Sequence, residues 1–156
     1  MYIEKYWGNY IGGSDDSMTL LEYLAAKRKE QLTVGEIFAD SGLDKLDDIS
    51  QSDGALSLPV DGLDADIQYA IDIIADLAAL LLECRKSGSI DLAELDMDEG
   101  IIIITASDEE HERINSALAA FAAEPSSYDI SEMMDEDELS EMATVCEQLR
   151  KELYGE

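Results

Sequence analysis

Apolar side chains recur at helical spacing most strongly between Leu63 and Glu83. The members that stand three and four residues apart are Ile67, Ala70, Ile71, Ile74, Leu77, Ala78 and Leu81. This spacing predicts an amphipathic helix. Further apolar residues widen the stripe until only a narrow polar edge is left, formed by Asp72, Asp76 and Glu83. A helix that is apolar over most of its circumference is expected in the middle of the core.

Four other segments carry helix signals. Ser17 is expected to cap a helix whose last turn holds the basic residues Lys27, Arg28 and Lys29, where cations suit the helix dipole. The capping-box spacing of Thr33 and Glu36 predicts a short helix that ends near Gly42, and Ser107 with Glu110 predicts another that Pro125 closes. A last helix is expected from about Asp135 to Tyr154, with Leu139, Met142, Cys146, Leu149 and Leu153 on its buried side.

Strand signals are shorter. The aromatic segment Tyr2 to Tyr10 suggests a short strand, and Ile49 to Val60 reads as two extended pieces around the Asp53-Gly54 turn. The segment Ile101 to Thr105 is β-branched throughout, which is typical of an interior strand covered on both faces. We therefore expect an α+β fold with about five helices, in which a central apolar helix packs on a small sheet of three to five short strands. The length of 156 residues fits a single globular domain over residues 1–156.

The charge balance is extreme for a chain of this size. Ten Lys and Arg stand against 37 Asp and Glu, which gives a formal net charge of −27. A useful net charge for a small soluble domain is roughly 2 to 8 in magnitude. Because no basic stripe is present to meet phosphates or anionic headgroups, nucleic acids and membrane surfaces are poor partners.

The sequence also bears on the compartment. The segment from Met1 to Trp7 lacks the basic and apolar regions of a secretory signal. The apolar run from Ile67 to Cys84 is interrupted by acids, so we expect no membrane span. Cys84 and Cys146 form no C-x-x-C pair and follow the apolar phase of their helices, which indicates buried, reduced thiols in a cytoplasmic protein.

Catalytic and metal-binding signals are weak. His111 is the only histidine and stands among acids in the first turn of an expected helix, a solvated setting without a positioned partner. The acidic run that ends at Gly100 fails as a calcium loop, because Leu95 and Met97 occupy the first and third ligand positions. Neither a G-x-G-x-x-G nor a Walker motif is present. We expect no catalytic residue, no metal site and no cofactor.

One short motif admits a second interpretation. Asp16, Ser17 and Met18 resemble the Asp-Ser-Leu motif of acyl carrier proteins, which carry phosphopantetheine on that serine. In that family a long helix precedes the motif, whereas only sixteen residues precede Ser17 here and they look extended and aromatic. Ser17 is therefore interpreted as a helix cap.

Two segments concentrate the acids. The first runs from Asp91 to Glu99 and the second from Asp129 to Glu141, and both adjoin expected irregular structure, where binding groups are often displayed. Such surfaces attract basic proteins and steer their association. The plainer alternatives are a solvated face that secures solubility and a salt-adapted proteome.

Two stretches carry a family resemblance, namely residues 2–17 and the helix of residues 69–84. They resemble an immunity family of bacterial polymorphic toxin systems. The resemblance implies a non-enzymatic cytoplasmic protein that binds and neutralises one cognate toxin domain. Many such toxins are nucleases with basic channels, which an acidic protein could occlude. The alternatives are a general acidic adaptor, a small acidic enzyme and a cation-binding protein, and homo-oligomerisation is left open.

Charge and aromatic content select the residues expected to contact a basic toxin. The aromatic residues would act as anchors if they are exposed, and the carboxylates would set association rate and partner choice. The alternative is that Trp7 and at least one of the tyrosines complete the core. The expected partner-binding residues are Tyr6, Trp7, Tyr10, Asp15, Asp16, Asp91, Glu94, Asp96, Asp98, Glu99, Asp129, Glu132, Asp135, Glu136, Asp137, Glu138 and Glu141.

Overall fold

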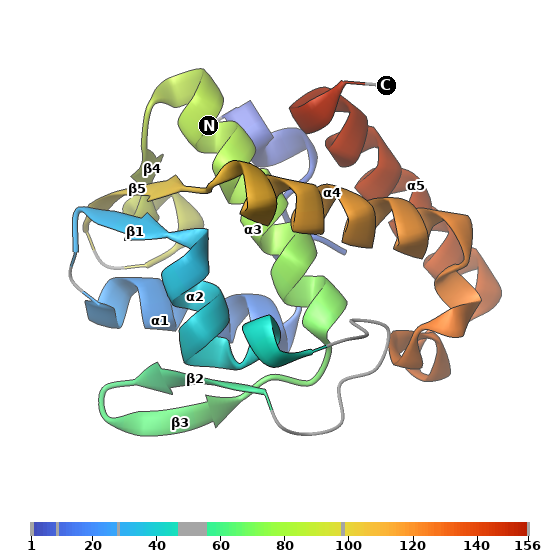
Figure 1. Ribbon diagram of the computed structural model, residues 1–156, viewed down its shortest axis with the longest axis horizontal. Coiled ribbons are helices and arrows are strands. Elements are labelled where there is room, and N and C mark those ends of the chain that lie inside the picture. The colour runs from blue at the N-terminus through green and yellow to red at the C-terminus, as the bar shows by residue number, and fades with distance from the viewer. Residues whose placement is uncertain (1, 9, 28, 47–55, 98, 156) are drawn as a thin grey trace.

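The computed structural model describes residues 2–8, 10–27, 29–46, 56–97 and 99–155 (Figure 1). Within these ranges it has five α-helices and two small sheets, which confirms the expected α+β class. The helices are α1 (Asp15–Lys27), α2 (Val34–Ser41), α3 (Ala70–Ser87), α4 (Asp108–Ala123) and α5 (Glu136–Tyr154). Short 3₁₀ turns are η1 (Tyr2–Lys5), η2 (Leu43–Lys45), η3 (Leu92–Leu95), η4 (Pro125–Ser127) and η5 (Asp129–Met133).

The strands form a mixed sheet and a hairpin. They are β1 (Gln31–Thr33), β2 (Ser57–Val60), β3 (Leu63–Asp66), β4 (Ile90–Asp91) and β5 (Ile101–Thr105). The mixed sheet has the order β1-β5-β4, with β1 parallel and β4 antiparallel to β5. The hairpin pairs β2 with β3. Its turn at Asp61 and Gly62 uses positive φ angles of 51° and 85°.

Helix α3 lies at the centre of the molecule, as its apolar pattern predicts. It crosses Figure 1 diagonally and contacts α1, α4, α5, η1, β4 and β5. Residues 70–83 are buried without exception, including the three acids of the expected polar edge. The polar edge is buried with the rest of the helix, because the N-terminal segment of the chain covers it and provides hydrogen-bond donors to two of these acids.

The start of α3 also differs from the prediction. Residues from Leu63 to Asp66 form β3, and the helix begins only at Ala70. Tyr69 at the cap position provides no side-chain bond, and Asp16 from α1 takes that role. Its two carboxylate oxygens accept the backbone N–H groups of Gln68 and Tyr69 at 2.8 Å. A cap from a distant helix leaves no local sequence signal, which is why the pattern alone places the helix start too early.

The N-terminal segment is not the expected strand. Residues Tyr2 to Lys5 form the 3₁₀ turn η1, and the only bridge described in this segment joins Trp7 to Ile11. Helix α1 begins at Asp15 rather than after Ser17. The cap position belongs to Ser14, whose hydroxyl accepts the Ser17 N–H at 3.0 Å, while Ser17 itself is buried.

Strand β5 is central but is not covered on both faces. Ile102 and Ile104 are buried on the side of α3, whereas Ile103 is half-buried and the side chain of Ile101 is 63% exposed. The four consecutive isoleucines therefore alternate between buried and more exposed side chains, although their residue type is the same. The predicted turn at Asp53-Gly54 lies outside the described residues, and the extended piece that ends at Val60 is confirmed as β2.

Three predicted helix ends are confirmed. Thr33 caps α2 by accepting the Glu36 N–H at 3.0 Å, and Gly42 ends this helix in the left-handed region at φ 89°. Ser107 forms the full capping box of α4 with Glu110. In the described part of the chain no helix is long and apolar enough to cross a membrane.

Candidate functional site

The structure brings Tyr10 together with the second acidic segment. The Tyr10 hydroxyl donates to Oε2 of Glu141 on α5 at 2.7 Å, although the two residues are 131 positions apart. This hydrogen bond, with the nearby charges of Glu138 and Asp135, raises the pKa of Tyr10 to about 12. We call Tyr6, Tyr10, Asp135, Glu138 and Glu141 the aromatic–acidic face.

The aromatic side chains of this region fix the N-terminal segment to the rest of the protein. The Tyr6 hydroxyl donates to Oε1 of Glu152 at 2.5 Å, and the Lys5 amine lies 2.8 Å from the same oxygen. Trp7 is half-buried against the core and lies over Gly12. These contacts favour the alternative in which Trp7 and a tyrosine pack against the core, and both tyrosine hydroxyls already donate to carboxylates of the same chain.

Several carboxylates of the aromatic–acidic face also have structural partners. Asp135 caps α5 by accepting the Glu138 N–H at 2.8 Å, and Glu138 returns the bond to the Asp135 N–H at 3.4 Å. Glu132, Glu136 and Asp137 are exposed, whereas Asp129 is half-buried. The segment is therefore anionic on its surface, but three of its acids stabilise a helix start or orient a tyrosine.

The first acidic segment lies on another side of the molecule. Asp91 is half-buried and caps η3 by accepting the Ala93 N–H at 3.1 Å. Glu94, Asp96 and Glu99 are exposed. In Figure 1 these residues follow β4 and precede β5 on the left, whereas α5 lies on the right. The structure thus separates the two acidic segments. Asp98 lies outside the described residues.

Four further acids are buried beneath the N-terminal segment. Gly12 N–H donates to Oδ1 of Asp76 at 2.8 Å, and Ile3 N–H donates to Oε1 of Glu83 at 3.1 Å. Asp16, an expected partner-binding residue, belongs to this group and is 2% exposed, whereas its neighbour Asp15 is exposed. Asp16 is therefore unavailable to a partner, because its carboxylate caps the start of α3 inside the protein.

Burial changes the protonation of this group. Removal from water raises the pKa of Asp76 to about 7. Burial, a hydrogen bond with Asp16 and the nearby Asp76 charge raise the pKa of Asp72 to about 9. These pKa values lie in the range of a general acid. Asp72 is only 4% exposed and Asp76 0% exposed, so a substrate cannot reach either carboxyl group in this conformation. Their geometry fits a structural role.

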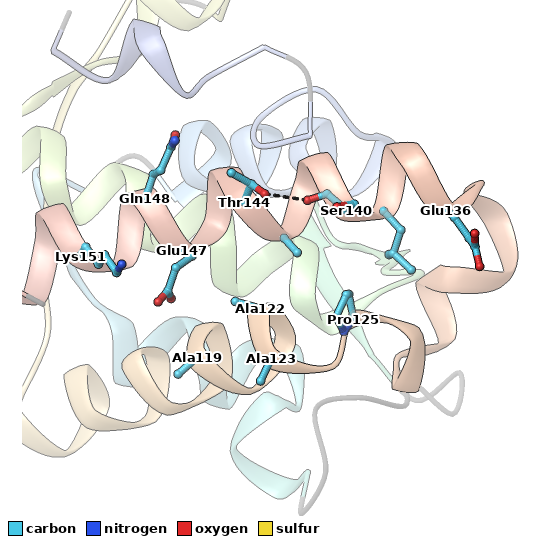
Figure 2. Close-up of a pocket in the computed structure, with 12 residues that line it drawn as sticks. Ala119, Ala122, Ala123, Pro125, Glu136, Ser140, Thr144, Glu147, Gln148 and Lys151 are labelled. Atoms are coloured by element: carbon cyan, nitrogen blue, oxygen red, sulfur yellow. Dashed lines mark hydrogen bonds between the residues drawn. The ribbon is translucent and has the colours of Figure 1, made fainter.

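A groove with a volume of about 670 Å³ lies between α4 and α5 (Figure 2). Its floor and walls carry small side chains, among them Ala119, Ala122 and Ala123 of α4. Glu136 stands at one end and Glu147 towards the other. The Glu147 carboxylate accepts two bonds from Arg150, at 2.6 and 2.8 Å, and is not poised for acid–base chemistry.

The setting of His111 differs from the expected solvated one. Its ring is partly buried, and Nδ1 lies 3.0 Å from the Tyr154 hydroxyl. Burial and the nearby Arg85 charge lower the pKa of His111, which keeps the ring neutral at pH 7. Among the described residues no three His, Cys, Asp or Glu side chains group in a way that could hold a metal ion.

Sequence reasoning missed a second groove. It has a volume of about 600 Å³ and lies between the end of α1, the hairpin turn and the start of β5. The exposed acids Glu22, Glu30, Asp61 and Glu99 line it. Only Glu99 belongs to one of the two acidic segments. The other three acids come from elements that are far apart in the sequence. Charge density along the chain could not reveal this cluster.

Comparison with protein families decides the assignment. The family model described as Immunity protein 68 matches residues 2–153, which is nearly the whole chain. The chain belongs to the Immunity protein 68 family. No curated protein and no solved structure matches the chain significantly. Membership confirms the resemblance carried by residues 2–17 and 69–84, and it implies a non-enzymatic role with a cognate toxin as partner.

Proposed function

We propose that this member of the Immunity protein 68 family binds and neutralises one basic toxin domain of a bacterial polymorphic toxin system in the cytoplasm. The observation that carries the proposal is the family match over residues 2–153 on a chain of net charge −27. An immunity protein needs a toxin partner, and a strongly anionic exterior selects a cationic one.

The mechanism we propose is occlusion by charge complementarity. The exposed carboxylates would take the place of the phosphate backbone of a nucleic acid. They would bind in the substrate channel of a nuclease toxin and block it. Complementary fields raise association rates to about 10⁸–10⁹ M⁻¹s⁻¹ at low salt. Fast capture suits a protein that must bind its toxin before the toxin reaches a substrate. No catalytic residue and no cofactor enter this mechanism.

The test uses the toxin domain encoded beside this chain, purified separately. We expect tight one-to-one binding and loss of toxin activity in the complex. Between about 50 mM and about 500 mM NaCl the association rate should fall by about tenfold or more, because exposed charges are screened beyond the Debye length. The control is a toxin domain of similar net charge from an unrelated system, which should bind far more weakly. Absence of binding would overturn the proposal, and salt-independent binding would overturn its electrostatic part.

A further inference from the structure

The groove between the end of α1, the hairpin turn and the start of β5 combines exposed carboxylates with an apolar floor. Four carboxylates stand around it: Glu22 and Glu30 on or after α1, Asp61 in the hairpin turn and Glu99 before β5. All four residues are exposed. Within the described part of the chain, their side chains make no hydrogen bond or ion pair. They are therefore ready to bind a cation.

The single cation described in the lining already has a partner. The Lys29 amine lies 3.2 Å from Oε2 of Glu36, on α2. Among the described residues that line the groove, four carboxylates therefore stand against one amine that is already paired.

The floor of the groove is apolar. Leu24, Leu92 and Ile102 are buried beneath it, and Val60 and Met97 are half-buried. Ile101 lines the groove with 63% of its surface exposed. A long aliphatic chain that ends in a positive charge matches this combination, because its stem can lie on the apolar floor while its head meets the carboxylates. Lysine and arginine side chains have that shape.

The aromatic–acidic face offers a poorer contact by the same criteria. Its tyrosine hydroxyls are bonded to Glu141 and Glu152, and its acids Asp135 and Glu138 cap α5. A partner would have to break these bonds or bind around them. Within the described part of the chain, no such bond would have to break at the four carboxylates of the groove.

We propose that this groove receives a basic segment of the partner, with a Lys or Arg side chain laid over Met97 and Ile101 and its cation among Glu22, Glu30, Asp61 and Glu99. The inference rests on the proposed function and names the surface through which it acts. A second copy of this chain is a poor occupant, because each copy carries a net charge of −27 and would bring like charge to the rim.

The first experiment locates the site without the toxin. The probe is a peptide of alternating Arg and Leu, five residues long with blocked ends, titrated into the ¹⁵N-labelled full chain and followed by NMR. We expect the largest shift changes at the amides of Glu99 and Ile101 and at the hairpin turn. The control peptide has Glu in place of Arg and should cause none. Equal or larger changes at the start of α5 would overturn the proposal.

The second experiment measures binding of the purified toxin domain encoded beside this chain. One variant combines Glu22→Gln, Asp61→Asn and Glu99→Gln. Its control combines Glu132→Gln, Glu136→Gln and Asp137→Asn, which removes the same number of exposed charges at the other acidic segment. We expect the groove variant to weaken binding by about tenfold or more and the control by less than about threefold. Ile101→Thr, which preserves a β-branched residue, should weaken binding several-fold.

The outcomes separate the two proposals. A control variant that loses as much affinity as the groove variant overturns the groove and leaves the immunity function in place. A native protein that binds the peptide at the groove but does not bind the toxin domain overturns the proposed function and supports the groove as a basic-segment site.

Discussion

The backbone N–H of Gly12 donates a 2.8 Å hydrogen bond to Oδ1 of Asp76, a carboxyl group that is fully buried in the central helix. The bond connects the N-terminal segment to the middle of the core. Burial of this carboxyl group raises its pKa to about 7. Stability should therefore depend on pH in a defined direction.

We expect the protein to lose stability as pH rises from about 4 to about 9. The unfolded chain releases the protons of Asp76 and Asp72 near the ordinary value of 3.8, whereas the folded chain retains them up to about 7 and about 9. The folded state thus binds more protons across this window, and each proton contributes up to about 1.4 kcal/mol per pH unit. Urea unfolding between pH 5 and pH 8 measures the slope.

The variant Asp76→Asn tests the source of that slope. The amide retains the oxygen that accepts the Gly12 N–H and removes the titration, so the variant should depend less on pH and gain stability at pH 8. The exposed Asp137→Asn change removes one charge without the burial and serves as the control. Equal slopes in both variants would contradict the assignment to Asp76.

Removal of the distant cap should destabilise the protein strongly. In Asp16→Ala, the N–H groups of Gln68 and Tyr69 lose both of their 2.8 Å acceptors. We expect a loss of about 2 to 3 kcal/mol in the free energy of unfolding, because hydrogen bonds to a charged group contribute about 1.5 to 3 kcal/mol. Asp15→Ala on the exposed neighbour should cost less than about 0.5 kcal/mol. Similar losses in the two variants would argue against the cap.

Gly12 should not tolerate a side chain. A Cβ atom there would lie 2.2 Å from the Trp7 ring, and φ is +79°. We expect Gly12→Ala to displace Trp7, change its fluorescence and cost more than Gly62→Ala. Gly62 has a similar φ of +85° with open space around it, so that variant isolates the backbone strain of about 1 to 2 kcal/mol. An unchanged tryptophan spectrum in Gly12→Ala would contradict the contact.

The two thiols should differ in reactivity. Burial raises the pKa of both cysteines, and Cys146 is fully buried, whereas Cys84 is half-buried. Because the thiolate is the reactive form, a disulfide reagent at pH 8 should modify Cys84 slowly and Cys146 only at the rate of unfolding. The variants Cys84→Ser and Cys146→Ser show which thiol gives rise to each kinetic phase of the modification. Fast modification of Cys146 in the native protein would be inconsistent with the packing.

Local sequence patterns predicted the parts of the fold that local forces determine. The capping residues Thr33 and Ser107 and the closing residue Pro125 act on neighbours within a few positions, and their helices are confirmed. The start of α3 depends on Asp16 from another helix, and no window around Tyr69 contains that information. The short strands β1 and β4 are stabilised by β5 rather than by their own composition.

The acidic residues also divide into features that the local sequence identifies and features that only the folded chain reveals. Density along the chain identified two exposed segments, but it could not separate a carboxylate that caps a helix, such as Asp135, from one that is free to bind. The sequence placed Asp72 and Asp76 on a narrow polar edge of the central helix, but it could not show that the N-terminal segment buries that edge. The rim of the groove was missed because Glu22 and Asp61 approach each other only in the folded chain.

The bond from Tyr6 to Glu152 joins residues 146 positions apart, and β1 pairs in parallel with the distant β5. Contacts over such separations close long loops, which slows folding. Ile3 and Gly12 already find acceptors on α3, so the contacts with α5 form a second attachment of the same segment. Loss of the end of α5 should therefore loosen the first residues without releasing them from the central helix.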